Sequence, residues 1–282
     1  MKHVILLLII SILATMLAFS QAAPSCCATS ATEEFGLLAA DARFVASHAK
    51  PLPFNFAPEK GTWVTFNTSD GTDGRAFEVR ADKPTNNVIL MVHEWWGLND
   101  YIQQEAEKLQ KALGNVTVLA LDLYDKKVAT TQEDAGKFMS EVKQERAVAI
   151  ANGAIQYAGK NARIGTIGWC FGGGWSLQAS LLAGKQAVAC VIYYGMPEKD
   201  ADRLKTLNAP VLGIFAKQDG WLTPALVGEF EKTMNDIKKP LTMKWYDGVH
   251  AFANPSNPKY DKAATEDAYK LTTEFFKKHL LK

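Results

Sequence analysis

The chain has 282 residues, of which 48% are hydrophobic and 22% are charged, and its formal net charge is +1. This length and hydrophobic content suffice for one large buried core or at most two small ones. The balanced charge argues against a surface that follows a nucleic-acid backbone, because such a surface needs an excess of basic residues. No nucleic acid is therefore expected as a partner.

The first residues have the pattern of a secretory signal peptide. A short basic start precedes the almost wholly apolar run Val4 to Phe19, and Ser20-Gln21-Ala22 offers small residues for cleavage after Ala22. The apolar run is shorter than the about 20 residues that span a bilayer, and no later segment is apolar enough to cross one. We expect residues 1–22 to be removed and the protein to be exported, either to the periplasm or out of the cell.

The four cysteines do not form the framework of a disulfide-rich protein. Cys26 and Cys27 are adjacent and follow the cleavage site. Adjacent cysteines rarely bridge to each other, which leaves a bridge to another chain or a lipid anchor at Cys26, although Ala23-Pro24-Ser25 matches a lipidation site poorly. Cys190 lies in an apolar run and is best explained as a small buried hydrophobe. Cys170 needs another explanation.

Residues 23–60 are interpreted as a polar, alanine-rich N-terminal arm and not as a domain, with a short helix around Glu33 to Ala46. From Gly61 the pattern changes. The half-buried strands Thr62 to Asn67 and Arg75 to Arg80 are joined by a loop rich in Asp, Gly and Thr, which predicts a hairpin. Continuous apolar runs then predict strands buried on both faces. These runs are 88–92, 116–121, 164–167, 188–194, 211–216 and 242–246.

Helices are predicted between these strands. Asp100 is expected to cap the first helix with Gln103 as its reciprocal partner, and one long helix is expected from about Thr131 to Ala158. Later helices begin near Gly173 and Pro224, and a last one carries an apolar face from residue 264 to 275. The alternation predicts an α/β domain over residues 61–282, with a mostly parallel central sheet, an N-terminal antiparallel hairpin and helices on both faces. Chemistry in such sheets lies at the carboxyl ends of the strands.

One strand end carries the pattern of a nucleophile elbow. The strand Arg163 to Ile167 runs into Gly168-Trp169-Cys170-Phe171-Gly172-Gly173, with cysteine in the position of the usual serine. The glycines let strand and helix approach closely around a strained turn, and the positive end of the next helix favours the reactive thiolate. A glycine-rich turn that binds phosphate or only packs is the alternative. The flanking strand and helix favour a nucleophile at Cys170.

Two further residues follow in the order expected of a catalytic triad. Asp219 comes just after strand 211–216, although an Asp there also commonly stabilises a turn. His250 lies in the loop after strand 242–246. In a triad, His250 would take the thiol proton and later return it to the leaving group, while Asp219 orients the ring. Of the other histidines, His48 falls in the arm and His93 ends a strand before the nucleophile, so neither is assigned to the triad.

These segments together resemble the dienelactone hydrolase family over roughly Gly61 to Leu281. The matching segments are residues 168–173, Gln218-Asp219, His250-Ala251-Phe252 and His93-Glu94-Trp95-Trp96-Gly97. The resemblance implies an α/β-hydrolase fold and hydrolysis of a small ester or lactone through a cysteinyl thioester. It implies that Cys170, Asp219 and His250 are the triad and that the backbone N–H groups of Trp95 and Phe171 form the oxyanion hole.

The same resemblance implies that Glu94 holds the resting cysteine as a thiol until substrate displaces it. A carboxylate beside a thiol disfavours the thiolate by like-charge repulsion, which supports this role independently. The alternatives for Glu94 are an acid at a helix entry or an ion-pair partner of Lys126.

The chain departs from the family where the founding enzymes hold the substrate carboxylate with two arginines, because Lys126 and Asn254 occupy these positions. A point charge without a forked partner is a weaker clamp, so dienelactone itself is not the expected substrate. Aromatic residues at the same loops predict a flat or apolar acyl or lactone substrate, unless they only cap the core. They are Trp95, Trp96, Tyr124, Trp169, Trp221 and Phe252. The segment 195–209 is too short for a lid domain, which predicts a small and open site.

No metal ion and no organic cofactor is implied. His93, Glu94 and His250 are conceivable metal ligands, but the triad order explains Glu94 and His250 better. The alternative function is a non-catalytic small-molecule binding protein of the same fold, although such a protein has no need of all three triad side chains. A thiol redox protein that uses Cys170 is a weaker alternative, because no second cysteine stands in a C-x-x-C pattern.

Overall fold

The computed structural model describes residues 30–282, so the expected signal peptide, Cys26 and Cys27 lie outside the described residues. Eight strands form one sheet, close to the predicted apolar runs and hairpin. They are β1 (Thr62–Phe66), β2 (Gly74–Val79), β3 (Asn87–Val92), β4 (Thr117–Leu121), β5 (Arg163–Trp169), β6 (Ala187–Tyr193), β7 (Val211–Ala216) and β8 (Leu241–Tyr246).

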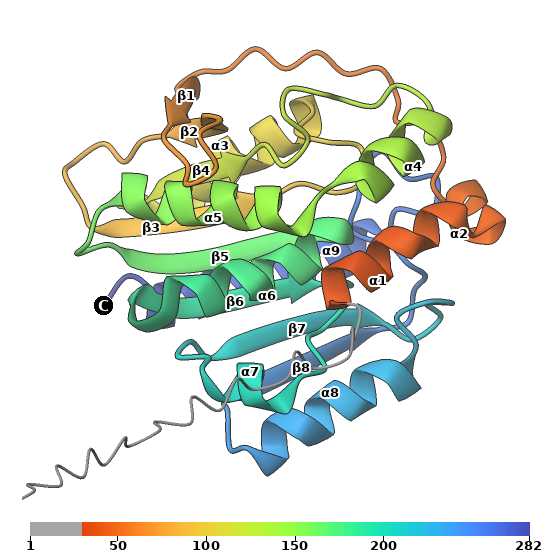
Figure 1. Cartoon of the computed structure of the whole chain (residues 1–282). Helices are drawn as coiled ribbons and strands as arrows, with labels where there is room; N and C mark the ends of the chain where they lie inside the picture. Colours follow the sequence, from red (N-terminus) through yellow and green to blue (C-terminus); the bar gives the residue numbers. More distant parts are fainter. Residues whose placement is uncertain (1–29) are drawn as a thin grey trace, which may run out of the picture.

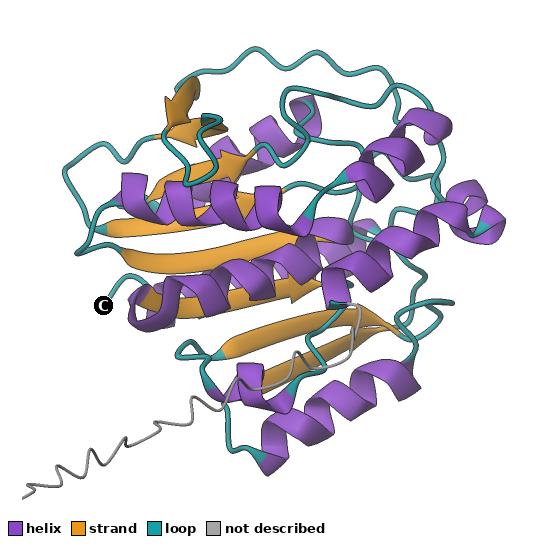
Figure 2. Ribbon diagram, in the orientation of Figure 1, coloured by secondary structure: helices purple, strands orange, loops and turns teal. Residues whose placement is uncertain are grey.

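The strand order in the sheet is β1-β2-β4-β3-β5-β6-β7-β8, and helices cover both of its faces (Figures 1 and 2). The pairs β1–β2 and β2–β4 are antiparallel, and all the other neighbouring pairs are parallel. The predicted α/β-hydrolase fold with its N-terminal hairpin is confirmed. Because β3 and β5 to β8 run in the same direction, the loops that follow them meet at one edge of the sheet.

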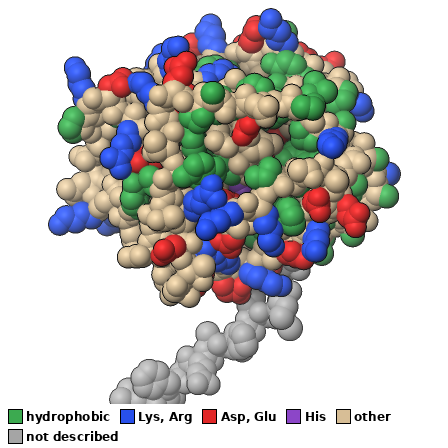
Figure 3. Space-filling view, turned by 90° about the horizontal axis from the view of Figure 1, so that it is seen from above, with side chains coloured by type: hydrophobic (Ala, Val, Ile, Leu, Met, Phe, Trp, Pro, Cys, Tyr) green, Lys and Arg blue, Asp and Glu red, His purple; other side chains and the backbone are tan. Residues whose placement is uncertain are grey.

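The helices within residues 61–282 account for the rest of the predicted alternation. They are α3 (Asp100–Leu113), α4 (Gln132–Glu141), α5 (Gln144–Ala158), α6 (Phe171–Ala183), η2 (Gly184–Gln186), α7 (Ala201–Lys205), α8 (Pro224–Asp236) and α9 (Lys262–His279). None of the helices in the described part of the chain is long and apolar enough to cross a membrane. On the face seen in Figure 3, acidic and basic side chains are interspersed with hydrophobic patches, as the near-zero net charge suggests.

Two helix predictions are wrong in detail. The predicted long helix is two helices, because Val142 and Lys143 adopt extended backbone between α4 and α5. This break lets α4 pack against the N-terminal arm while α5 packs against α6 and β2. The cap of α3 is Asn99, whose side chain accepts the Ile102 N–H at 3.2 Å. Asp100 instead accepts the backbone N–H of Phe56, 3.0 Å away in the arm.

The N-terminal arm is folded onto the domain. It forms α1 (Ala31–Gly36), the 3₁₀ helix η1 (Leu37–Ala40) and α2 (Ala42–Ser47), with a break at Asp41, which caps α2. In Figure 1 α1 (red) lies beside α6, which it contacts directly, and α2 packs against α4. Farther along, the Glu107 carboxylate accepts the N–H groups of Lys60 and Gly61 at 2.8 and 2.7 Å. The arm is therefore tied down at both of its described ends.

The close approach of α6 to the sheet depends on glycine. A Cβ placed on Gly172 would lie 2.3 Å from the Val92 carbonyl oxygen and 2.4 Å from that of His93. Both atoms belong to the backbone at the end of β3, so no side-chain rotation relieves the overlap.

Gly172→Ala should therefore push α6 away from β3 and lower the free energy of unfolding by about 1–3 kcal/mol, as overpacking does. Gly228→Ala is the matched control, because Gly228 lies inside α8 with open space at the position of its Cβ. The control should be neutral or stabilise by up to about 1 kcal/mol. Urea unfolding measures both variants, and equal stability of the two would contradict the close-approach argument.

Candidate active site

Cys170 occupies a strained turn between β5 and α6. Its φ of 56° and ψ of −120° are unusual for a residue that carries a side chain. The turn is held in place because the Cys170 N–H donates to the Tyr193 carbonyl at 3.0 Å. The backbones of Gly168 and Gly172 on either side of the turn are in direct contact. A Cβ on Gly168 would lie 2.0 Å from the Gly172 carbonyl oxygen. This geometry presents the sulfur at the carboxyl edge of the sheet.

The structure brings together the three side chains that were predicted as a triad. His250 Nε2 lies 3.3 Å from Cys170 Sγ, and His250 Nδ1 donates to Asp219 Oδ2 at 2.6 Å. The other Asp219 oxygen accepts the backbone N–H groups of Trp221 and Leu222 at 2.9 and 3.0 Å. Since Nδ1 carries the proton that Asp219 accepts, the lone pair of Nε2 faces the thiol.

The pKa values of Cys170, His250 and Asp219 follow from their burial and from their effects on one another. Burial raises the pKa of the Cys170 thiol, and His250 only partly offsets this. Burial also disfavours a charged imidazole, but the Asp219 carboxylate outweighs it and raises the pKa of His250. Burial likewise disfavours the Asp219 anion, but the His250 ring and two backbone N–H groups lower the pKa of that carboxyl. The result is a basic imidazole beside a thiol that is hard to ionise in isolation.

Glu94 follows the end of β3, and its carboxylate is hydrogen-bonded to residues other than Cys170. Its carboxylate accepts the Tyr194 hydroxyl at 3.3 Å and the side-chain amide of Asn254. Burial raises the pKa of Glu94 to about 7, although His250 and these two hydrogen bonds oppose the shift. The charge of Glu94 in turn adds to the raised pKa of Cys170. Glu94 thus acts on the thiol through space.

A small cavity of about 70 Å³ reaches Glu94 from one side. Of the residues predicted to bind substrate, Trp96, Trp169 and Asn254 line it together with Tyr194. Asn254 has a second contact, because its amide also holds Glu94. The cavity wall therefore combines aromatic rings with charged groups, which are the Glu94 carboxyl group, Glu105 and Lys108.

The other residues predicted to bind substrate lie elsewhere. Tyr124 is buried and donates its hydroxyl to the Trp95 carbonyl at 3.2 Å. Phe252 is fully buried beneath the ring of Tyr194. The Trp221 indole N–H donates to Asp41 of the arm at 3.1 Å. Lys126 is exposed and lines a different pocket on the outside of the domain.

Of the two positions predicted as the oxyanion hole, Phe171 directly follows Cys170. Phe171 is the first residue of α6, and its backbone N–H lowers the pKa of the Cys170 thiol. Trp95 follows Glu94 after β3, and its ring packs against His48 at 4.5 Å between centroids. His93, by contrast, is a core histidine, because its Nδ1 donates to the Glu94 carbonyl at 2.6 Å and its Nε2 accepts the Leu123 N–H. It is held by backbone groups and not by the thiol.

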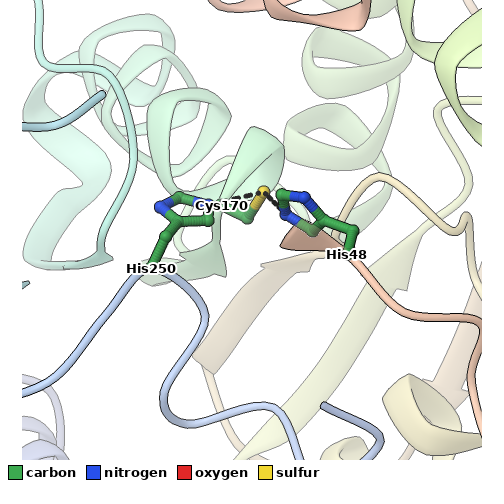
Figure 4. A group of neighbouring side chains, drawn as sticks. All are labelled: His48, Cys170 and His250. Atoms are coloured by element: carbon green, nitrogen blue, oxygen red, sulfur yellow. Dashed lines mark hydrogen bonds between the residues drawn. The ribbon is translucent and has the colours of Figure 1, made fainter. Parts of the chain in front are cut away.

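His48 is a site residue that the sequence did not reveal. It follows α2 in the arm, and its Nε2 lies 3.9 Å from Cys170 Sγ, on the other side of the sulfur from His250 (Figure 4). Its Nδ1 donates to the Phe44 carbonyl at 2.7 Å. Burial lowers the pKa of His48 to about 3. The one signal in the sequence was local: Phe44 and His48 are four residues apart, which places them on one helical face.

The arm also covers the thiol. Phe44 is fully buried, and its ring centroid lies 4.3 Å from that of His48, 5.2 Å from that of Trp221 and 5.7 Å from that of His250. Cys170 is 1% exposed. The expectation of an open site is therefore wrong. No lid domain covers the site; the aromatic residues of the arm do.

Comparisons with known proteins place the chain in a family. The model of the dienelactone hydrolase family matches residues 75–280. The chain belongs to the dienelactone hydrolase family. It is 27% identical over 228 residues to carboxymethylenebutenolidase 1 of Cupriavidus pinatubonensis, a match that covers 73% of this chain and 95% of the relative. It is also similar to protein usf of Aquifex pyrophilus, with 28% identity that covers 68% of this chain and 88% of that protein.

Solved structures agree on the fold. The dienelactone hydrolase of Anabaena variabilis superposes with a TM-score of 0.57 at 20% identity, covering 78% of this chain and 98% of that chain. A protein of Klebsiella pneumoniae that is named a putative dienelactone hydrolase superposes with a TM-score of 0.66 at 20% identity, covering 77% of this chain and 99% of that chain. Family membership and these relatives identify the protein as a hydrolase of the ester or lactone type.

The raised pKa of Glu94 predicts a pH-dependent stability. The pKa of the Glu94 carboxyl group is near its ordinary value of 4.5 in the unfolded chain and near 7 in the folded chain. The folded state binds more protons between these values, so stability falls as pH rises through this window. Glu94→Gln has no such proton, and wild type should lose roughly 3 kcal/mol more than this variant between pH 4.5 and 8. Urea unfolding across this range measures the difference, with the exposed Glu59→Gln as control; parallel curves for wild type and Glu94→Gln would contradict the prediction.

The covering of the thiol predicts the effect of Phe44→Ala. Removing the ring should cost about 3–5 kcal/mol and should increase the rate at which iodoacetamide labels Cys170, measured by mass spectrometry of the peptide that contains it. Phe230→Ala is the control, because Phe230 is equally buried in α8 but is not among the aromatic rings around His250. A faster labelling of Cys170 in both variants would show a general loss of stability and not a specific cover.

Proposed function

We propose that this protein hydrolyses a small ester or lactone through a cysteinyl thioester, with Cys170 as nucleophile. The observation that carries the proposal is the hydrogen-bonded chain from Cys170 Sγ through His250 to Asp219, with distances of 3.3 and 2.6 Å. His250 is the general base and acid, and Asp219 fixes its tautomer and orientation. The alternative, a non-catalytic binding protein, leaves this arrangement without a purpose.

The reaction begins when His250 Nε2 takes the thiol proton and the sulfur attacks the carbonyl carbon. The backbone N–H groups of Trp95 and Phe171 stabilise the negative charge on the carbonyl oxygen. The carbon–oxygen bond of the ester then breaks, and His250 returns the proton to the leaving oxygen. In the second half, His250 takes a proton from water, which attacks the thioester, and the proton finally returns to the sulfur as the acid leaves.

Glu94 is proposed to keep the resting Cys170 in the thiol form. The like charge of an ionised Glu94 disfavours the thiolate, and an un-ionised sulfur resists oxidation. In this protein Tyr194 and Asn254 hold the carboxylate in place, so the effect does not need a direct hydrogen bond from the sulfur.

The proposed substrate is small, neutral and flat. The cavity beside Glu94 is small and aromatic, with Trp96 and Trp169 in its wall. The relative from Cupriavidus is named for a butenolide lactone, but Lys126 lies in another pocket and Asn254 holds Glu94. Neither residue is thus placed to hold a substrate carboxylate, which favours short neutral esters or unsubstituted lactones.

Export is proposed together with this activity. The support is the sequence of residues 1–22, with its basic start, apolar run and small residues before the cleavage point. Mass determination of the chain from the native host, with and without lipid extraction, would show whether it begins at Ala23 and whether Cys26 carries a lipid.

A panel of nitrophenyl esters of short acids and of small lactones tests the mechanism. Cys170→Ala should abolish hydrolysis, and Asp219→Asn should lower kcat by about 10²–10⁴-fold, because the imidazole loses its orienting anion. Cys190→Ala is the matched control, since this second buried thiol is hydrogen-bonded to Ser176 and lies away from the elbow; it should keep its activity.

Hydrolysis that persists in Cys170→Ala would overturn the cysteine mechanism. An inactive wild type that nevertheless binds lactones in calorimetry would favour the non-catalytic alternative.

A further inference from the structure

Two imidazole lone pairs point at one sulfur. His48 Nδ1 donates to the Phe44 carbonyl and His250 Nδ1 donates to Asp219, so in the neutral form of each ring Nε2 is the acceptor. These two nitrogens lie 3.9 and 3.3 Å from Cys170 Sγ. A thiol has one hydrogen and can donate to only one of them. The proposed hydrolysis uses His250 and gives no role to the lone pair of His48.

The spacing of the three atoms suits a metal ion. In a tetrahedral zinc site the Zn–S distance is about 2.3 Å and the Zn–N distance about 2.0–2.1 Å, which puts neighbouring ligand atoms roughly 3.3–3.6 Å apart. The ligand atoms of His48, Cys170 and His250 all lie within 4.8 Å of one another. Small rotations of side chains that already face each other would close this triangle around an ion (Figure 4).

The surroundings complete such a site. Metal-bound histidines usually donate their other N–H to a carbonyl or a carboxylate, and here the Phe44 carbonyl and the Asp219 carboxylate take these roles. A Zn²⁺ ion, a Cys170 thiolate and the Asp219 anion also sum to zero charge, which matters because all these groups are buried. One thiolate with two imidazoles selects zinc over magnesium or calcium.

We propose that His48, Cys170 and His250 bind Zn²⁺ and that the bound ion inhibits the hydrolase. On binding, the S–H bond of Cys170 breaks, a Zn–S bond forms and the proton goes to solvent; both imidazoles stay neutral and nothing is oxidised or reduced. The inhibition rests on the proposed function, because the ion occupies both the nucleophile and the general base. His48 is the ligand that the N-terminal arm adds, and it turns a pair of ligands into a chelating set of three.

Cobalt is the probe for the site, because a cobalt–thiolate bond has a charge-transfer absorption band in the near ultraviolet. The experiment uses the full chain with Cys26→Ser and Cys27→Ser, so that Cys170 and Cys190 are its only thiols. One equivalent of Co²⁺ should produce the band, Zn²⁺ should remove it by displacement, and ester hydrolysis should disappear over the same zinc titration. Cys170→Ala should lack the band while its circular dichroism is unchanged.

His48→Gln separates the metal site from catalysis. Zinc inhibition is measured relative to the esterase rate of the variant without metal, whatever that rate is. His48→Gln should need at least about 100-fold more zinc for half-inhibition, because loss of a hydrogen-bond partner of a ligand alone costs about 10–100-fold in metal affinity and here a ligand itself is lost. His279→Gln, a change at a histidine near the C-terminus and far from the sulfur in sequence, should keep the zinc response of wild type. If His48→Gln fails to fold, X-ray absorption at the zinc edge of wild type provides the test, with one sulfur and two imidazoles expected.

Three results would overturn the proposal: no cobalt–thiolate band in wild type, unchanged zinc sensitivity in a folded His48→Gln, or a zinc shell with fewer than two imidazoles. A wild type without any esterase activity would refute the proposed hydrolysis only. A band that depends on His48 and Cys170 would then still support the metal site.

Discussion

The site depends on the backbone contact that holds the turn at Cys170. Because Gly168 and Gly172 touch, α6 starts directly above the end of β5 and forces the cysteine to a φ of 56°. The strain is sustained by the parallel strands around it, which anchor both sides of the turn. The same parallel arrangement brings the loops after β7 and β8 to this edge. Asp219 and His250 reach the sulfur for that reason and not because of any local sequence feature.

Burial sets the pKa values at this edge of the sheet, and the arm contributes to that burial. Burial is the largest cause of the raised pKa of Cys170, of the raised pKa of Glu94 and of the lowered pKa of His48. Phe44 lies between His48, Trp95, Trp221 and His250, so the arm contributes directly to the dry environment of the sulfur. A solvated edge would weaken all three shifts, since desolvation disfavours whichever form of a group carries the charge.

The sequence was informative where the pattern is local. Apolar runs predicted the strands because strands covered on both faces need continuous apolar side chains, and the elbow glycines predicted the position of Cys170. Two helix boundaries were predicted wrongly. Asn99 caps α3 in place of its neighbour Asp100, and both residue types are good helix caps. An extended Val142 ends α4 within a stretch of good helix formers, so no residue type marks the break. His48 was missed because its contact with Cys170 joins residues that are 122 positions apart. Nothing in the polar, alanine-rich sequence of the arm predicts this contact.

Asn254 has a further consequence for the choice of substrate. The Asn254 amide holds Glu94 in place, so a polar group of the cavity wall is used inside the protein. A substrate carboxylate that entered the cavity would meet the Glu94 carboxyl group, with a pKa of about 7. The one cationic side chain among the residues that line the cavity is Lys108, which is already paired with Glu105 at 3.2 Å. Above that pH the repulsion between the two like charges would oppose binding. A neutral ester or lactone avoids this cost, which supports the proposal of an uncharged substrate.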